Sequence, residues 1–150
     1  MGICVFGHWL FGKPDYVKKM EEIEKLGTEI EEIKWMIDQE TVRFHRDMDR
    51  IVNGSEIRSN EILAASERDI ERIDENETPV LKEAEITLFL ANVDLELTAN
   101  MQDALHCLAG EKSRHDTEMA RLIERRDACY TRLDELVDDY RACYGGFVDF

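Results

Sequence analysis

The 150-residue chain carries 34 acidic and 19 basic residues, which gives a formal net charge of −15 at pH 7. Binding to nucleic acid requires clustered Lys and Arg, and phosphate backbones repel a chain with acid in excess in both halves. We therefore expect no nucleic-acid partner. Only two prolines and eight glycines occur, and 35% of the residues are charged, a composition that favours long helices over sheets.

No targeting or membrane-spanning signal is visible. The chain lacks a run of about 18 apolar residues, and its start lacks the features of a signal peptide. The expected location is cytoplasmic, with peripheral membrane contact as an option. Helical spacing keeps Cys107, Cys129 and Cys143 too far apart for disulfides within one chain, and no zinc-ligand spacing occurs, so reduced thiols are predicted.

Residues 1–13 form an apolar, aromatic segment, MGICVFGHWLFGK, with no charge before its last residue. Tryptophan and neighbouring lysines favour a membrane interface, so this segment is a candidate for shallow insertion. The tentative membrane-contacting residues are Phe6, Trp9, Leu10 and Phe11. The alternative is that the segment folds back onto the helices, and the acidic net charge opposes binding to anionic lipid.

The first long helix is predicted from about Tyr16, with Asp15 as its N-cap, to Val52, before a break at Asn53-Gly54. Its apolar residues follow a heptad pattern: Ile23, Ile30, Ile37, Phe44 and Ile51, with Leu26 and Ile33 three residues after the first two. This spacing is typical of a coiled-coil seam. Later seam positions hold Glu40 and Asp47, so we expect looser packing toward Asn53.

A second helix is expected from Ser55 to about Glu75, with a sparse apolar face of Ile57, Leu63, Ile70 and Ile73. Thr78-Pro79 supplies the start of a third helix. That helix carries two apolar stripes: one is Leu81, Ala84, Leu88, Ala91 and Leu95, and the other is Ile86, Leu90, Val93 and Leu97. Two stripes predict a central helix that is covered from two directions.

Gly110 is expected to end the third helix, and Ser113 with Asp116 resembles a capping box for a fourth. The fourth helix presents a seam of Met119, Leu122, Cys129, Leu133, Leu136, Tyr140 and Cys143 before Gly145-Gly146. Short connections favour antiparallel neighbours. The expected fold is all-α, either a long antiparallel helical hairpin or a three-to-four-helix coiled-coil bundle over residues 14–144, followed by a tail at 145–150.

No motif for catalysis or for cofactor binding is found, so the chain is interpreted as a protein without enzymatic activity and without a cofactor. Asp103, His106, Cys107, His115 and Asp116 flank the expected turn at Gly110. Their spacing is not diagnostic of a metal site, and no Glu stands three residues before a histidine as in di-iron bundles. We therefore assign no metal ligands, and a metal-binding bundle is kept as the least favoured alternative.

The order of segments resembles the N-terminal core of ESCRT-III proteins and of the phage-shock-type membrane-remodelling proteins. The similar stretches, within residues 1–108, are VFGHWLFGKP, ILAASERDIERI and LFLANVDLELTANMQ. The resemblance implies a helical hairpin that polymerises on membranes, with Phe6, Trp9, Leu10 and Phe11 at lipid-inserting positions. The chain departs from that family in its acidic first two helices and in Thr78-Pro79, which interrupts the second arm.

These observations predict a coiled-coil assembly or interaction protein. Its expected partner is itself or another coiled-coil protein, with a membrane surface as a further option. Trp35 and Val42 lie seven residues apart, off the main seam, and are tentative partner contacts or an ordinary packing face. The competing interpretation is a soluble helical adaptor or protein inhibitor with no membrane role.

Overall fold

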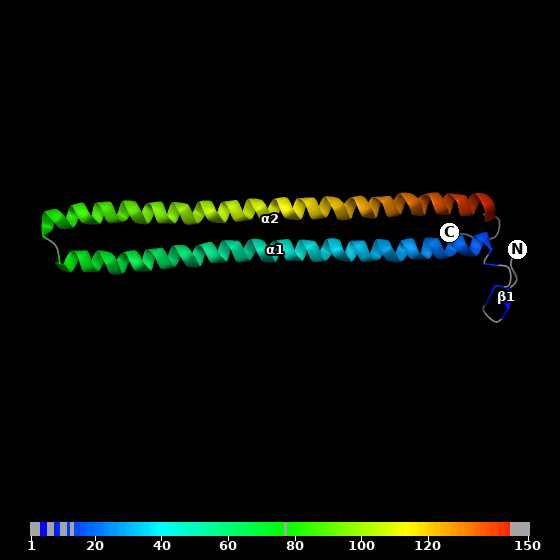
Figure 1. Cartoon of the computed structure of the whole chain (residues 1–150), viewed down its shortest axis with the longest axis horizontal. Helices are drawn as coiled ribbons and strands as arrows, with labels where there is room; N and C mark the ends of the chain where they lie inside the picture. Colours follow the sequence, from blue (N-terminus) through cyan, green and yellow to red (C-terminus); the bar gives the residue numbers. More distant parts are fainter. Residues whose placement is uncertain (1–3, 6–7, 10–11, 13, 77, 145–150) are drawn as a thin grey trace. The chain divides into compact units, whose positions relative to one another are not determined.

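The computed structural model describes residues 4–5, 8–9, 12, 14–76 and 78–144. Two long helices dominate them, α1 (Asp15–Asn76) and α2 (Pro79–Tyr144), preceded by the two-residue strands β1 (Cys4–Val5) and β2 (His8–Trp9) (Figure 1). The strands pair antiparallel, with Cys4 opposite Trp9 and Val5 opposite His8. The prediction of an all-α chain is confirmed at this level, while the short strand pair was not foreseen.

Two expected helix breaks are wrong. α1 continues through Asn53-Gly54 and α2 continues through Gly110, so the described chain has two helices where the sequence suggested four. A glycine inside a helix costs only about 1 kcal/mol relative to alanine, which continued backbone hydrogen bonds and packing readily offset. A third or fourth helix within residues 14–76 and 78–144 is therefore absent.

The predicted boundary at Thr78-Pro79 is confirmed. The Thr78 carbonyl accepts a hydrogen bond from the Lys82 amide at 2.7 Å, which closes the first turn of α2, and proline takes the first helical position. At the start of α1, the Pro14 carbonyl accepts bonds from the amides of Val17 and Lys18, both 3.1 Å. Asp15 is consequently the first helical residue rather than the cap before it, a shift of one position.

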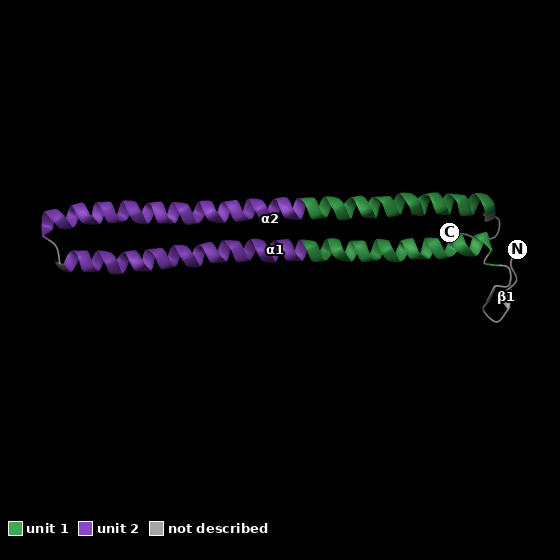
Figure 2. Ribbon diagram, in the orientation of Figure 1, with its two compact units in different colours: residues 1–40, 117–150 green, residues 41–116 purple. Residues whose placement is uncertain are grey.

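Contacts divide the chain into two units, each containing part of both helices: residues 1–40 with 117–150, and residues 41–116 (Figure 2). In unit 1 the first part of α1 runs antiparallel to the last part of α2. Its core is made of Ile30, Ile33, Leu122 and Cys129, with Leu26, Met36, Ile37 and Leu133 packed around them. Leu136 and Tyr140 are also buried. Predicted seam residues of both helices thus pack together here, among them Ile30 and Ile33 on α1 and Leu122 and Cys129 on α2. Cys143 is exposed, and the seam residues Phe44 and Ile51 belong to unit 2.

Interhelical ion pairs flank the seam of unit 1. Arg125 Nη2 lies 3.3 Å from Glu29 Oε1, and Arg132 Nη2 lies 3.1 Å from Glu22 Oε1. The two glutamates are seven residues apart on α1 and the two arginines seven apart on α2, so the pairing repeats after one heptad with opposite chain direction. Arginine residues in the last part of α2 therefore pair with glutamate residues in the first part of α1.

Unit 2 pairs the second part of α1 with the first part of α2, and fewer of its hydrophobic side chains are buried than in unit 1. Ile62 and Val93 are its buried hydrophobic residues, and the buried Ser66 donates a hydrogen bond to the Leu63 carbonyl at 2.7 Å. The predicted face of Ile57, Leu63, Ile70 and Ile73 is wrong in its first half, because Ile57 and Leu63 are 61% and 45% exposed, whereas Ile70 and Ile73 are half-buried. The predicted face assumed that a new helix begins after Gly54. Because α1 continues through Gly54, Ser55, Ser59 and Ile62 lie at the seam instead.

Candidate interaction surfaces

The five polar residues that flank Gly110 do not converge on a metal site. Asp103, His106, Cys107, His115 and Asp116 all lie along the continuous α2, because Gly110 makes no turn. The His115 ring instead stacks on Phe44 of α1, with ring centroids 4.0 Å apart and planes 16° from parallel. Within residues 14–76 and 78–144, no group of three or more His, Cys, Asp or Glu side chains is arranged to hold a metal ion.

The three cysteines predicted to be reduced differ in environment. Cys107, Cys129 and Cys143 are free thiols, and Cys129 is buried in the core of unit 1 while the other two are exposed. Burial raises the pKa of the Cys129 thiol, and the charge of Glu29 raises it further. A thiol that stays protonated is a poor nucleophile, so Cys129 serves packing.

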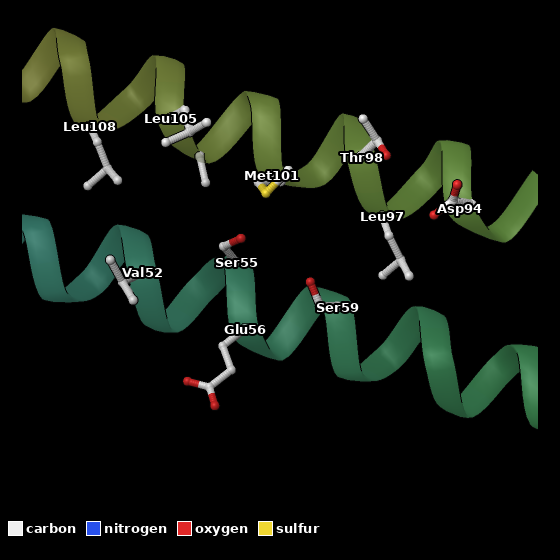
Figure 3. A pocket seen from close by; sticks show the side chains of 11 residues that line it. Val52, Ser55, Glu56, Ser59, Asp94, Leu97, Thr98, Met101, Leu105 and Leu108 are labelled. Carbon is white, nitrogen blue, oxygen red and sulfur yellow. The ribbon is translucent and has the colours of Figure 1, made fainter.

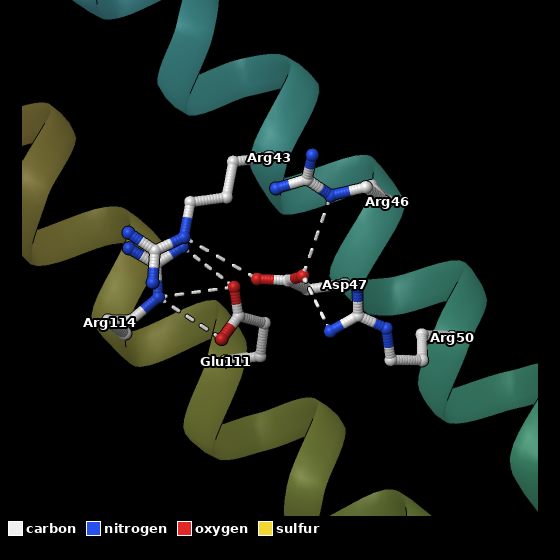
Figure 4. A network of polar contacts seen from close by, with 6 residues as sticks. All are labelled: Arg43, Arg46, Asp47, Arg50, Glu111 and Arg114. Carbon is white, nitrogen blue, oxygen red and sulfur yellow. Dashed lines mark hydrogen bonds and ion pairs between the residues drawn. The ribbon is translucent and has the colours of Figure 1, made fainter.

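A polar cluster occupies the seam position that the sequence assigned to Asp47. Arg43 and Arg50 each approach the Asp47 carboxylate to 3.6 Å, and Arg46 reaches it at 4.0 Å (Figure 4). From α2, Arg114 Nη2 donates to Glu111 Oε1 at 2.7 Å, and this hydrogen bonding holds the pKa of Glu111 below its ordinary value. Charged groups thus pack together in this part of unit 2, where a coiled coil ordinarily places apolar side chains.

A second polar layer lies further along the hairpin. Asn100 of α2 donates from its side-chain amide to the Ser55 carbonyl at 2.9 Å and to the Ser59 hydroxyl at 2.9 Å. Beside this layer is an open groove of about 670 Å³, and Figure 3 shows its lining from both helices. The apolar lining residues are Val52, Leu97, Met101, Ala104, Leu105 and Leu108.

The first apolar stripe of α2 is uncovered. Leu81, Leu88 and Leu95 are 54%, 68% and 69% exposed, and Ala84 and Ala91 between them are exposed as well. The second stripe is better covered, with Val93 buried and Ile86 and Leu97 half-buried, although Leu90 is 48% exposed. The expectation that both stripes are covered within the chain is therefore wrong, because the described part of the chain supplies only one neighbouring helix to α2.

The two tentative partner contacts lie off the seam. Trp35, in unit 1, is 63% exposed, and Val42, in unit 2, is 59% exposed. Sequence analysis did not single out Met101 and Leu105, although their spacing from Leu97 by four and eight residues was a readable signal of a helix face. Contact of Trp35 and Val42 with a partner stays a prediction.

The tentative membrane-contacting residues lie largely outside what the structure describes. Phe6, Leu10 and Phe11 are not among the described residues, and Trp9 is placed only as a backbone position in β2. Neither α1 nor α2, as far as the structure describes them, has a stretch long and apolar enough to cross a bilayer.

Comparisons with family models, curated proteins and solved structures give no match to this chain.

Proposed function

We propose that this chain is a coiled-coil assembly protein without enzymatic activity, which self-associates through apolar helix faces of unit 2. Two surfaces of unit 2 are candidates: the groove beside Asn100 and the uncovered leucine stripe of α2. Both surfaces are apolar helix faces, and such faces commonly pack against a helix of another molecule.

One observation carries the proposal. Six of the eight buried hydrophobic residues among those described lie in unit 1, whereas eleven of the fifteen exposed large hydrophobic residues lie in unit 2. Both units are built from the same two helices, so the difference reflects the residues along them rather than a change of fold. Contiguous exposed apolar surface of this kind marks interaction sites in stable proteins.

The predicted membrane contact is a separate part of the proposal. It rests on the residues of the first segment and on the resemblance to ESCRT-III proteins. Flotation with anionic liposomes compares the full chain with a variant carrying Trp9→Glu and Phe11→Glu. Co-flotation of the full chain and loss in the variant support membrane contact, and equal failure of both contradicts it.

Light scattering across a wide range of protein concentration tests self-association. We expect the apparent mass to rise above the 17.5 kDa of the single chain as concentration increases. A mass that stays at that of one chain up to millimolar concentration contradicts the assembly function and favours the adaptor alternative, in which unit 2 is covered by a different protein.

A further inference from the structure

We propose that the uncovered stripe of α2, made of Leu81, Ala84, Leu88, Ala91 and Leu95, is a symmetric dimer interface in which two copies of α2 pair antiparallel. The inference rests on the proposed self-association and specifies its interface and geometry. The stripe faces away from α1, as the exposure of its leucines shows, so a second copy reaches it without disturbing the hairpin.

The stripe is complementary to itself when reversed. Its leucines and alanines alternate at spacings of three and four residues, so an antiparallel copy brings leucine opposite alanine in successive layers. In the register that uses all three leucines, Leu88 faces Ala91 of the second copy and Leu95 faces Ala84 of it. Leu81 then faces Thr98. Large residues opposite small ones interdigitate at an even helix spacing.

Parallel pairing lacks this complementarity. It stacks Leu88 on Leu88 of the second copy and Ala91 on Ala91, so wide and narrow layers alternate along the contact. The leucine layers hold the two helix axes too far apart for the alanine side chains to touch, so the alanine layers are left underpacked. The pattern therefore favours the antiparallel, isologous arrangement, in which each copy contributes the same surface.

The charges beside the stripe agree with pairing to a second copy. The flanking positions nearest to it hold Glu85, Thr87, Asn92 and Asp94. Antiparallel pairing in the same register places Glu85 near Asn92 of the second copy and Thr87 near Asp94 of it, so no two carboxylates face each other. An acidic chain that pairs with itself requires this separation, since like charges directly opposite are destabilising.

The proposed contact between the two α2 helices is short, and its length determines how stable the dimer is expected to be. From Leu81 to Thr98 it spans about 26 Å of helix at about 1.5 Å per residue. Interfaces at the small end of the known range form reversible complexes, so we expect a concentration-dependent dimer rather than a permanent one.

Sedimentation analysis of the full chain and three matched variants tests the interface. Leu88→Glu is expected to weaken dimerisation at least tenfold, while the control Leu63→Glu on α1 leaves it near that of the unmodified chain. Leu105→Glu tests the groove as the competing surface and should weaken dimerisation less than Leu88→Glu does. All three side chains are exposed in the monomer, so helical content and melting temperature should be unchanged.

Orientation is tested by Asn92→Lys. Antiparallel pairing brings the new ammonium group near Glu85 of the second copy, so dimerisation should strengthen several-fold, and the gain should vanish when Glu85→Gln is added. Parallel pairing brings it near Thr87, with no such dependence on Glu85. Gln39→Lys in unit 1 controls for the general reduction in negative charge.

The outcomes separate the two proposals. If the chain associates but Leu88→Glu has no larger effect than Leu63→Glu, or if only Leu105→Glu disrupts association, the stripe is not the interface and self-association stands. A gain from Asn92→Lys that persists with Glu85→Gln overturns the antiparallel register. A chain that never associates overturns the proposed function together with this interface.

Discussion

At the scale of single residues, the glycines within the helices show how local signals compete with longer-range packing. A Cβ built at Gly54 or at Gly110 meets no atom within 4 Å, so neither position requires glycine for close approach. Both lie inside continuous helix. Gly12 differs, because its φ of 80° is a left-handed conformation that side chains disfavour.

Gly54→Ala is therefore expected to stabilise the protein by about 0.4–1 kcal/mol, because alanine loses less conformational entropy on forming a helix. The free energy of unfolding in urea measures the change. Gly12→Ala serves as the contrasting substitution and should destabilise. A loss of stability in Gly54→Ala would show that the chain breaks at Asn53-Gly54 after all.

At the scale of the paired helices, α1 and α2 bury most of their seam side chains in unit 1 and few of them in unit 2. In unit 1, isoleucine and leucine side chains fill the seam, and arginine–glutamate pairs cover its flank. Exposed ion pairs add little to stability, so the buried residues carry most of it. In unit 2, the Asn100 and Asp47 layers replace apolar contacts with polar ones. Polar layers of this kind define register in coiled coils at a cost in stability.

Leu122→Ala should consequently cost about 2–5 kcal/mol, since it opens a cavity around a side chain that is 1% exposed. Leu105→Ala removes the same atoms from a side chain that is 58% exposed, and should change stability by no more than about 0.5 kcal/mol. Urea midpoints of the two variants provide the comparison. Equal costs would mean that Leu105 is covered in the folded chain.

At the scale of the whole molecule, the net charge of −15 opposes every association between copies. This repulsion acts over about 30 Å at 0.01 M salt but only about 10 Å at 0.1 M salt. Charge repulsion therefore opposes association through an apolar interface, and added salt weakens this repulsion.

Raising the salt concentration from 0.01 M to 0.15 M should tighten self-association several-fold, in contrast to a contact held by opposite charges, which salt weakens. Light scattering at matched protein concentrations measures the effect. Association that falls as salt rises would indicate an ionic interface rather than the leucine stripe.

The heptad spacing of Ile30, Ile33 and their neighbours, and the Thr78-Pro79 boundary, were readable from the sequence because each depends on residues close together in the chain. The sequence also showed that α2 has two apolar stripes. It could not show that the Leu81–Leu95 stripe is left uncovered, because that follows from α2 having only one neighbouring helix in the described chain. Nor could it show that Ile62 rather than Leu63 faces the seam, because that follows from α1 continuing as one helix past Gly54. Continuity of a helix is decided by the packing of its whole length, and that is a property of tertiary structure.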